Sequence, residues 1–177
     1  RMERESRISR LGSSELAFFL LSFRALSDTL RLDVQVDEQF ALEGTEAERE
    51  RVTRAVIGLV NAVRFRAARG AEAENTLRME FRRGKDGVEL RLDFAGETAD
   101  EEGLRREWDK VLDRAGRIRA FWRHGGEDGE GGTGGEGGSA ADPDKAGSGA
   151  GSPEADSAPR PPGWSAVVVF PCRRGAE

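Results

Sequence analysis

The chain has very few of the residues on which several kinds of functional site depend. Its 177 residues include one cysteine, Cys172, and one histidine, His124. A lone cysteine forms no internal disulfide, which favours a reducing compartment, so we expect the protein in the cytoplasm. One cysteine and one histidine also fall short of a protein-only zinc site, and we expect no metal centre. His124 borders a glycine-rich stretch, so we expect it in a solvated loop and not in a serine–histidine triad.

The chain also lacks long apolar runs and an excess of basic residues. Its longest apolar run, Leu16–Phe23, is far shorter than the ~20 residues that cross a bilayer. The net charge of −5 leaves no basic excess to neutralise the phosphates of a nucleic acid. We therefore expect neither a membrane span within this chain nor a nucleic-acid partner.

Glycine is abundant by contrast, and much of it lies in one stretch. Between residues 125 and 163 the composition changes to Gly, Ser, Ala, Asp, Glu and Pro, without apolar periodicity. Such a segment cannot offset the entropy of ordering it, so we predict a long disordered insertion. Its glycine clusters lack the strand–loop–helix context and the Lys-Ser/Thr pair of a phosphate-binding loop. Lengthening a loop from ~10 to ~38 residues adds only about 1.2 kcal/mol, so a strand beyond it can rejoin the sheet.

The pattern at the N-terminus predicts a helix. Residues 1–30 look helical, and the segment Glu15–Leu26 is apolar around most of its circumference. Such a helix is buried on more than one side, either against a partner helix or second subunit or wholly within its own domain. The chain thus divides into a helix that is either a dimerisation or a core helix (1–30), a core (31–124), a disordered insertion (125–163), a closing strand (164–171) and a tail (172–177).

Alternating apolar residues predict the strands. Leu30–Val36 alternates as a half-buried strand does. Leu77–Phe81 and Val88–Phe94 flank the short turn Gly84–Gly87 and predict a β-hairpin. Ser165–Phe170 has no polar alternation, which predicts a strand that is central or buried on both faces. Between hairpin and insertion, one helix is predicted over residues 100–119.

The longest helix is predicted from Thr45 to Arg69. Thr45 and Glu48 have the spacing of a capping box, which marks the start of the helix. Besides its core-facing stripe, this helix has a line of residues spaced four apart, which places one side-chain amide between two large apolar residues: Ile57, Asn61 and Phe65. An apolar stripe at helical spacing predicts the face that packs on the core, and it consists of Val52, Val56, Leu59 and Val63.

This order of elements predicts an α/β two-layer sandwich, in which helices cover one face of a single mixed sheet. In this order the chain resembles the ATP-binding domain of histidine kinases, the Bergerat or GHKL fold. The resemblance rests on three segments. Arg54–Arg64 is similar to the family's N box, Val88–Gly96 to the strand that ends in Asp-x-Gly, and Gly163–Pro171 to the last glycine and strand.

The resemblance implies a nucleotide pocket whose functional residues have been replaced. Asn61 matches the N-box asparagine that binds magnesium, but Ile57 replaces the family's glutamate and Phe65 replaces a polar or basic residue. Phe94 corresponds to the aspartate that accepts the adenine amino group. Gly96 corresponds to the glycine of the following turn, where positive φ is needed. The phosphoacceptor histidine expected on the preceding helix is absent from residues 1–30.

We interpret these five positions as a vestigial nucleotide pocket. Phe94 cannot accept the adenine hydrogen bond, and Ile57 supplies no charge for phosphoryl transfer. We expect Ile57, Phe65 and Phe94 to collapse against one another. Asn61 is then a relic or a polar residue of the helix surface.

Three functional hypotheses follow. The first is a catalytically degenerate histidine-kinase-like domain, without catalytic residues or cofactor, that acts as a signalling or dimerising module through its N-terminal helix. The alternative is an active ATP-binding domain of a two-component sensor histidine kinase, with Mg-ATP on Asn61 and Asp93 recognising adenine. Strand alternation points Asp93 away from Phe94, so this alternative needs a bulge. The third is an unrelated α/β scaffold.

Replacing residues 125–163 with a short Gly-Ser linker should leave the Tm nearly unchanged, because nothing in the stretch can build a core. Thermal unfolding followed by circular dichroism measures this. A large fall in Tm would mean that the segment packs on the rest of the chain.

Overall fold

The computed structural model describes residues 7–67, 74–124 and 162–172. The predicted disorder of residues 125–161 and the tail beyond residue 172 therefore fall outside the described residues. In chain order the elements are a 3-10 turn η1 (Ser9–Leu11), α2 (Ser14–Leu26), β1 (Arg31–Val36), α3 (Glu46–Arg66), β2 (Thr76–Arg83), β3 (Gly87–Ala95), α4 (Glu101–Leu112), β4 (Arg117–His124) and β5 (Gly163–Pro171).

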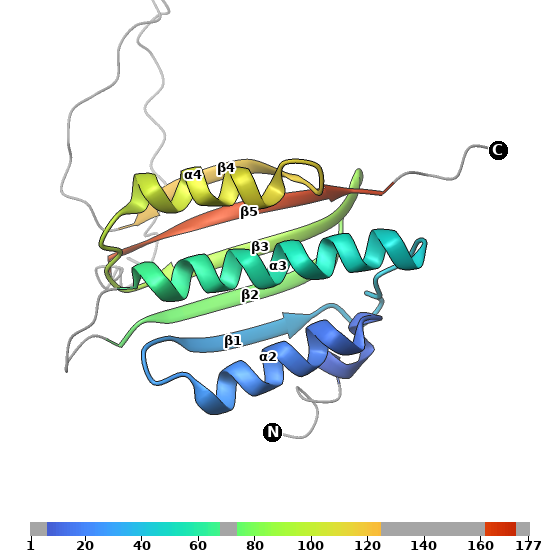
Figure 1. Cartoon of the computed structure of the whole chain (residues 1–177), viewed down its shortest axis with the longest axis horizontal. Coiled ribbons are helices and arrows are strands. Elements are labelled where there is room, and N and C mark those ends of the chain that lie inside the picture. Colours follow the sequence, from blue (N-terminus) through green and yellow to red (C-terminus); the bar gives the residue numbers. More distant parts are fainter. Residues whose placement is uncertain (1–6, 68–73, 125–161, 173–177) are drawn as a thin grey trace, which may run out of the picture.

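Five strands form one mixed sheet in the order β1-β2-β3-β5-β4. β1 runs parallel to β2, and the other neighbouring pairs are antiparallel. Figure 1 shows α2, α3 and α4 on one face of this sheet, with α2 next to β1 and α4 next to β4. The predicted α/β two-layer sandwich, with one mixed sheet covered by helices on one face, is confirmed.

The hairpin and the central last strand are also confirmed. β2 and β3 pair antiparallel, and the Gly84 amide donates to the Gly87 carbonyl across the turn, at 2.7 Å. β5 lies between β3 and β4, and Ser165 and Val169 are buried even on its uncovered face. The strand begins at Gly163, and the Gly96 amide donates to the Pro162 carbonyl at 2.8 Å. The linker replacement described above should therefore end at residue 161.

The prediction of one helix over residues 100–119 is wrong after Leu112. α4 ends at Leu112, whose carbonyl accepts hydrogen bonds from the amides of Ala115 and Gly116, and the chain turns back. Arg117–His124 then forms β4, which pairs antiparallel with β5. The partner of β4 follows the long insertion in the sequence, so no local pattern reveals it, and tertiary pairing overrides the helical spacing.

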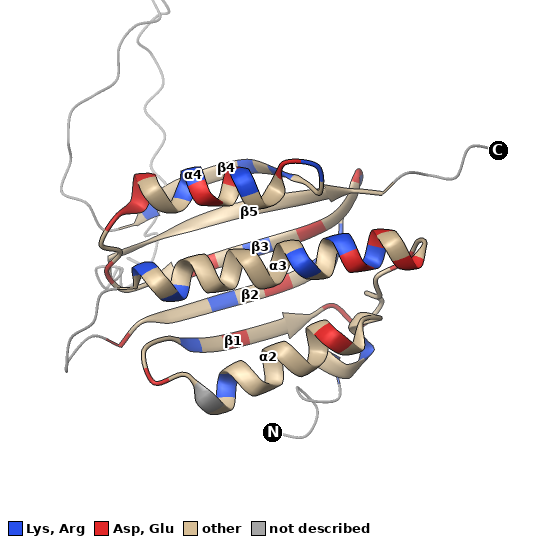
Figure 2. Cartoon of the chain, viewed as in Figure 1, with Lys and Arg blue, Asp and Glu red and all other residues tan. Residues whose placement is uncertain are grey.

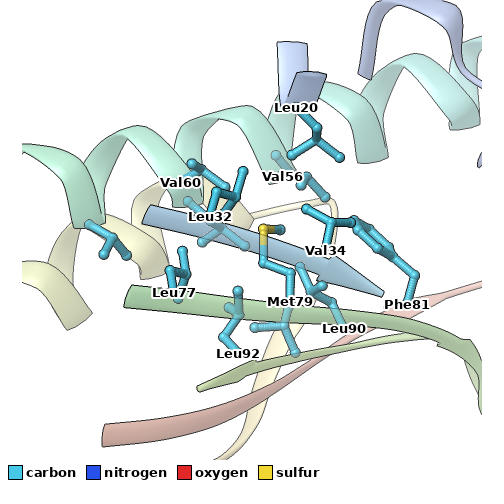
Figure 3. Packing of buried hydrophobic residues seen from close by; sticks show 14 of the residues in the cluster. Leu20, Leu32, Val34, Val56, Val60, Leu77, Met79, Phe81, Leu90 and Leu92 are labelled. Carbon is cyan, nitrogen blue, oxygen red and sulfur yellow. The ribbon is translucent and has the colours of Figure 1, made fainter. Parts of the chain in front are cut away.

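The hydrophobic core lies between the sheet and the helices (Figure 3). Side chains of alternate residues on each strand point to this side, as the pleat requires. Burial of each such side chain contributes roughly 1.5–3 kcal/mol. Figure 3 labels buried residues from both the helices and the strands: Leu20, Leu32, Val34, Val56, Val60, Leu77, Met79, Phe81, Leu90 and Leu92.

The inner side of helix α2 packs against the core of this domain. Leu16 and Leu20 are fully buried, whereas Phe18 on the outer side is 75% exposed. The hydroxyl of Thr53 on α3 donates to that of Ser13, the residue that caps α2, at 2.8 Å. The helix is therefore covered on one side within its own chain. In the ranges described here, no helix has the length and apolar character needed to cross a membrane.

Candidate functional site

The predicted capping box is present at the start of α3, the helix that carries the line Ile57, Asn61 and Phe65. The Thr45 side chain accepts from the Glu48 amide at 3.2 Å, and the Glu48 side chain accepts from the Thr45 amide at 3.0 Å. Thr45 satisfies one of the amides that a helix start leaves without partners, which sets the first residue of α3. The apolar residues Val56, Leu59 and Val63 then decide which face of α3 packs on the core.

Ile57, Asn61 and Phe65 follow the outer edge of α3. Ile57 and Asn61 are half-buried, whereas Phe65 is 72% exposed. Four residues advance the helix by about 40° beyond a full turn, so the line rotates from the core margin at Ile57 to solvent at Phe65. The predicted collapse of Phe65 onto Ile57 and Phe94 is therefore wrong. The side-chain amide of Asn61 makes no hydrogen bond with any residue that the structure describes.

Phe94 lies on the covered face of β3 and belongs to a cluster of aromatic rings centred on Trp164. It is 2% exposed and stacks on Trp164 of β5, with ring centroids 5.3 Å apart. Trp164 also stacks on Phe121 at 5.4 Å and meets the edge of Trp108 at 5.0 Å. We call Phe94, Trp108, Phe121 and Trp164 the aromatic cluster. It fills the space between the sheet and α4.

The polar atoms of the aromatic cluster are satisfied. The indole nitrogen of Trp108 donates to the Leu59 carbonyl of α3 at 3.2 Å, and that of Trp164 donates to the Thr98 hydroxyl at 3.1 Å. Buried tryptophans normally need such partners. The two hydrogen bonds tie α4 to α3 and β5 to the loop after β3. The indole nitrogens of the cluster therefore have partners within the protein, as in an ordinary hydrophobic core.

Helices α3 and α4 close over this region as an antiparallel pair. A Cβ built on Gly58 would lie 2.8 Å from Val111 Cγ1, so the two helices touch here. At the other end, Arg66 forms an ion pair with Glu107, and the Ala99 amide donates to the Arg66 carbonyl at 2.9 Å. Solvent-open clefts of about 350, 450 and 480 Å³ lie among the described residues, one between α3 and α4 and one beside Phe121 of the aromatic cluster. None of them is lined by Ile57, Asn61, Phe65, Phe94 or Gly96.

Gly96 has the positive φ predicted for it, 141°. A Cβ at this position would collide with Oδ1 of Asn75, a buried side chain. Asn75 donates to the Thr29 carbonyl at 3.4 Å and accepts from the Glu97 amide at 3.3 Å. Gly96 is therefore required by backbone geometry and by Asn75, which joins the loop before β1 to the loop after β3.

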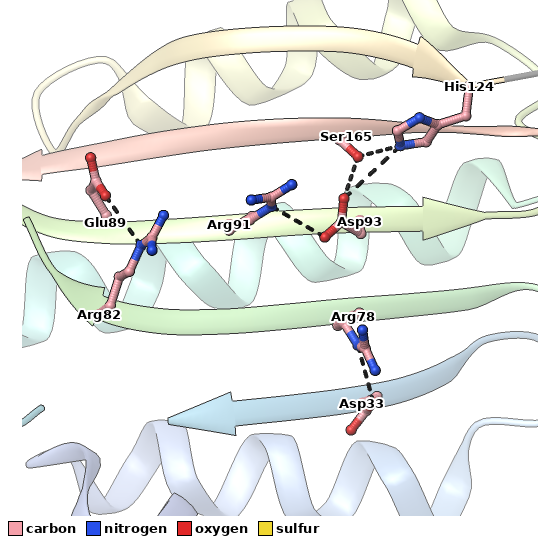
Figure 4. A network of polar contacts seen from close by, with 8 residues as sticks. All are labelled: Asp33, Arg78, Arg82, Glu89, Arg91, Asp93, His124 and Ser165. Carbon is pink, nitrogen blue, oxygen red and sulfur yellow. Dashed lines mark hydrogen bonds and ion pairs between the residues drawn. The ribbon is translucent and has the colours of Figure 1, made fainter. Parts of the chain in front are cut away.

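The uncovered face of the sheet carries a polar network (Figure 4). Ser165 donates a hydrogen bond to Asp93 and contacts His124, and His124 Nε2 lies 4.0 Å from Asp93 Oδ1. Arg91 Nε is 3.4 Å from Asp93 Oδ2, an ion pair without hydrogen-bond geometry. The prediction of a solvated loop for His124 is wrong, since it ends β4 and its side chain is 17% exposed.

The network does not have the geometry of a nucleophilic triad. The Ser165 hydroxyl directs its proton to the carboxylate of Asp93 and is fully buried, so no substrate reaches it. Asp93 pairs with Ser165 in regular register, without a bulge in β3. It therefore stays on the face opposite Phe94, where it cannot take the place of an adenine-binding aspartate.

Trp108, Phe121, Trp164 and Asn75 are the residues of this region that sequence reasoning missed. Trp164 follows the glycine that begins the last strand, and Trp108 lies on the apolar side of a predicted helix. The contact between Phe121 and Trp164 depends on the pairing of β4 with β5. The signal available was the presence of tryptophan and phenylalanine in segments far apart along the chain.

Phe94→Ala should lower the free energy of unfolding by about 3–5 kcal/mol, because it removes a ring stacked inside the core. Phe65→Ala deletes the same ring from an exposed position and should change it by only about 0.5 kcal/mol. Urea unfolding of both variants measures the difference. Equal stability of the two variants would contradict the burial of Phe94.

Comparison with known proteins identifies the family. Residues 12–121 match the model of the family described as sporulation initiation phospho-transferase B, C-terminal. Among solved structures, the chain is similar to the Erythrobacter litoralis EL346 blue-light activated histidine kinase, with 8% identity and a TM-score of 0.53. The alignment covers 92% of this chain and 42% of the kinase, so the chain spans less than half of that protein. No curated protein sequence matches the chain.

The two matches agree with the architecture in different ways. The family match extends from the start of the α2 region to the middle of β4. The structural match has only 8% sequence identity, so it shows a similar fold and nothing more. Since the family match spans more than half of the 177 residues, the chain belongs to the sporulation initiation phosphotransferase B C-terminal family and has a fold found in a histidine kinase.

Proposed function

We propose that this chain is a catalytically degenerate ATPase-like domain of the GHKL type, which works in a signalling protein by binding and not by catalysis. Its family and fold relate it to proteins of phosphotransfer signalling. The observation that carries the proposal is the aromatic cluster. Phe94, at the position of the adenine-binding aspartate in the family it resembles, is stacked on Trp164 and is 2% exposed.

The residues at the vestigial positions do not fit Mg-ATP. The ring of Phe94 cannot accept a hydrogen bond from the adenine amino group. Ile57 has no charge with which to orient a phosphoryl group or activate an acceptor. Asn61 offers one oxygen, and a magnesium ion held by protein normally uses carboxylates together with substrate phosphates. We therefore derive no catalytic step through the nucleotide.

The alternative, an active two-component histidine kinase, is compatible with the family and the fold, but among the five vestigial positions only Asn61 favours it. Asp93 lies on the uncovered face, bonded to Ser165, and not on the face of Phe94. The one histidine of the chain, His124, is at the end of β4 in the polar network. A phosphoacceptor histidine is normally on the helix that precedes the domain in the family that this chain resembles. These placements favour the degenerate, pseudokinase-like function.

The binding role is assigned to the outer side of the helical layer. Phe18 on α2 is 75% exposed although its neighbours Leu16 and Leu20 are fully buried. Single exposed apolar side chains are common on protein surfaces, so Phe18 supports the proposal only together with the half-buried Phe19 and Leu21 on the same helix. We propose that α2 mediates self-association of the domain within the cytoplasm.

Isothermal titration calorimetry with Mg-ATP and Mg-ADP should give no saturable heat, because the aromatic cluster fills the core beside the vestigial positions. Incubation with labelled ATP should give neither autophosphorylation nor hydrolysis. The matched comparison is Asn61→Ala, which should behave like the parent chain. Magnesium-dependent turnover in the parent that disappears in Asn61→Ala would refute the proposal.

Phe18→Asp should shift the protein toward the monomer in light scattering at concentrations where the parent associates, because the change buries a charge in the proposed contact. Phe65→Asp places the same charge on another exposed phenylalanine, 72% exposed on α3. It should leave association unchanged. A parent chain that is monomeric at all concentrations would exclude self-association.

A further inference from the structure

A cleft rich in arginine lies between the first turns of α3 and the end of α4. Its volume is about 350 Å³, and it opens to solvent. Arg51 and Arg54 of α3 and Arg114, just after α4, line it together with Glu50, over apolar walls that include Ala55 and Val111. Asn61 and Phe65 lie further along α3, at the end away from the cleft. The function proposed above makes no use of it.

The packing of the two helices explains why the cleft exists. α3 and α4 touch at Gly58 and Val111, and beyond this contact they continue toward the start of α3 and the end of α4. The chain leaves α4 at Leu112, where Ala115 and Gly116 bond back to its carbonyl. The residues facing the gap include the small side chains Ala47, Ala55 and Ala115. Small residues leave the space between the helices unfilled.

The charges around the cleft are unbalanced. Arg54 forms an ion pair with Glu50, one turn before it. Arg51 and Arg114 are exposed, and neither forms an ion pair with another residue in the described part of the chain. Figure 2 shows basic and acidic residues interspersed at this end of the helical layer, so the excess of positive charge is confined to the lining of the cleft. A chain with a net charge of −5 thus has three guanidinium groups and one carboxylate around a single cleft.

We propose that this cleft is a binding site for a phosphate ester. A phosphate monoester carries a charge of roughly −1.5 to −2 at neutral pH, which matches the two guanidinium groups without a partner, Arg51 and Arg114. The planar guanidinium donates two parallel hydrogen bonds to phosphate oxygens. The apolar walls at Ala55 and Val111 contact the carbon part of the ester. Small-molecule sites begin at roughly 300 Å³, so the cleft holds one such group.

This inference is independent of the fate of the nucleotide pocket. The cleft involves residues 47–55 and 111–115, whereas the vestigial nucleotide positions involve residues 57–65 and 94–96. A titration that follows individual backbone amides separates the two regions. Binding of Mg-ATP at the second region would refute the proposed function and leave the cleft proposal unaffected.

The test is a titration of the labelled protein with phenyl phosphate, followed by two-dimensional amide spectra at constant ionic strength. Saturable shifts are expected at residues 47–55 and 111–115. Arg51→Ala combined with Arg114→Ala should weaken binding by at least about tenfold, since each guanidinium makes charge-assisted hydrogen bonds. Arg24→Ala combined with Arg31→Ala removes the same charge from exposed positions near β1 and should change affinity by less than about twofold.

Two further probes define the ligand. Phenylacetate has the same ring and a single negative charge, so it should bind at least about fivefold more weakly than phenyl phosphate. A short alanine peptide with one phosphoserine distinguishes a phosphorylated protein from a free phosphate ester. Binding of the peptide more tightly than phenyl phosphate identifies a phosphorylated segment of a partner as the source, and the reverse order identifies a small phosphate ester.

Three results would overturn the proposal. They are the absence of saturable shifts at the cleft with phenyl phosphate, equal weakening by the two double variants, and equal affinity for phenylacetate and phenyl phosphate. Arg114→Lys keeps the charge and removes the planar fork, so it provides a milder test if the double variant unfolds. It should still weaken phenyl phosphate binding by about threefold or more, and unchanged affinity would also count against the site.

Discussion

The packing of Trp164 is the interaction on which the rest of this structure depends. Its ring contacts Phe94 and Phe121 through stacked faces and Trp108 through an edge, so one side chain joins β3, β4, β5 and α4. The indole of Trp108 extends the connection to α3 through the Leu59 carbonyl. Aromatic pairs of this kind contribute energy beyond the area they bury. Removal of this packing would weaken the contacts that hold the last strand and α4 against the core.

The same packing supports the proposed loss of nucleotide binding. A nucleotide site needs a concave space with a few polar groups directed into it. Here that side of the sheet is filled by rings whose polar atoms are already bonded to Leu59 and Thr98. We propose that binding takes place instead at the surface, on the outer side of α2 and in the arginine-rich cleft between α3 and α4. A common fold therefore does not imply a common function.

The pleat of β3 assigns opposite roles to adjacent residues. Phe94 faces the helices and joins the aromatic cluster, whereas Asp93 faces solvent and bonds to Ser165. Cross-strand ion pairs such as Asp33 with Arg78 and Arg82 with Glu89 continue this polar face across the sheet (Figure 4). A shift of one residue in register would exchange the two faces, so the alternation of β3 and the polar network support the same register.

The sequence by itself determined the features that depend on neighbouring residues. The capping box at Thr45 and Glu48, the hairpin around Gly84–Gly87 and the positive φ at Gly96 follow from local chemistry, and the order of these elements predicts the two-layer fold. The tertiary structure decided the existence of β4, the exposure of Phe65 and the place of His124 in a partly buried network. Each of these depends on a partner distant along the chain, and local periodicity holds no information about such a partner.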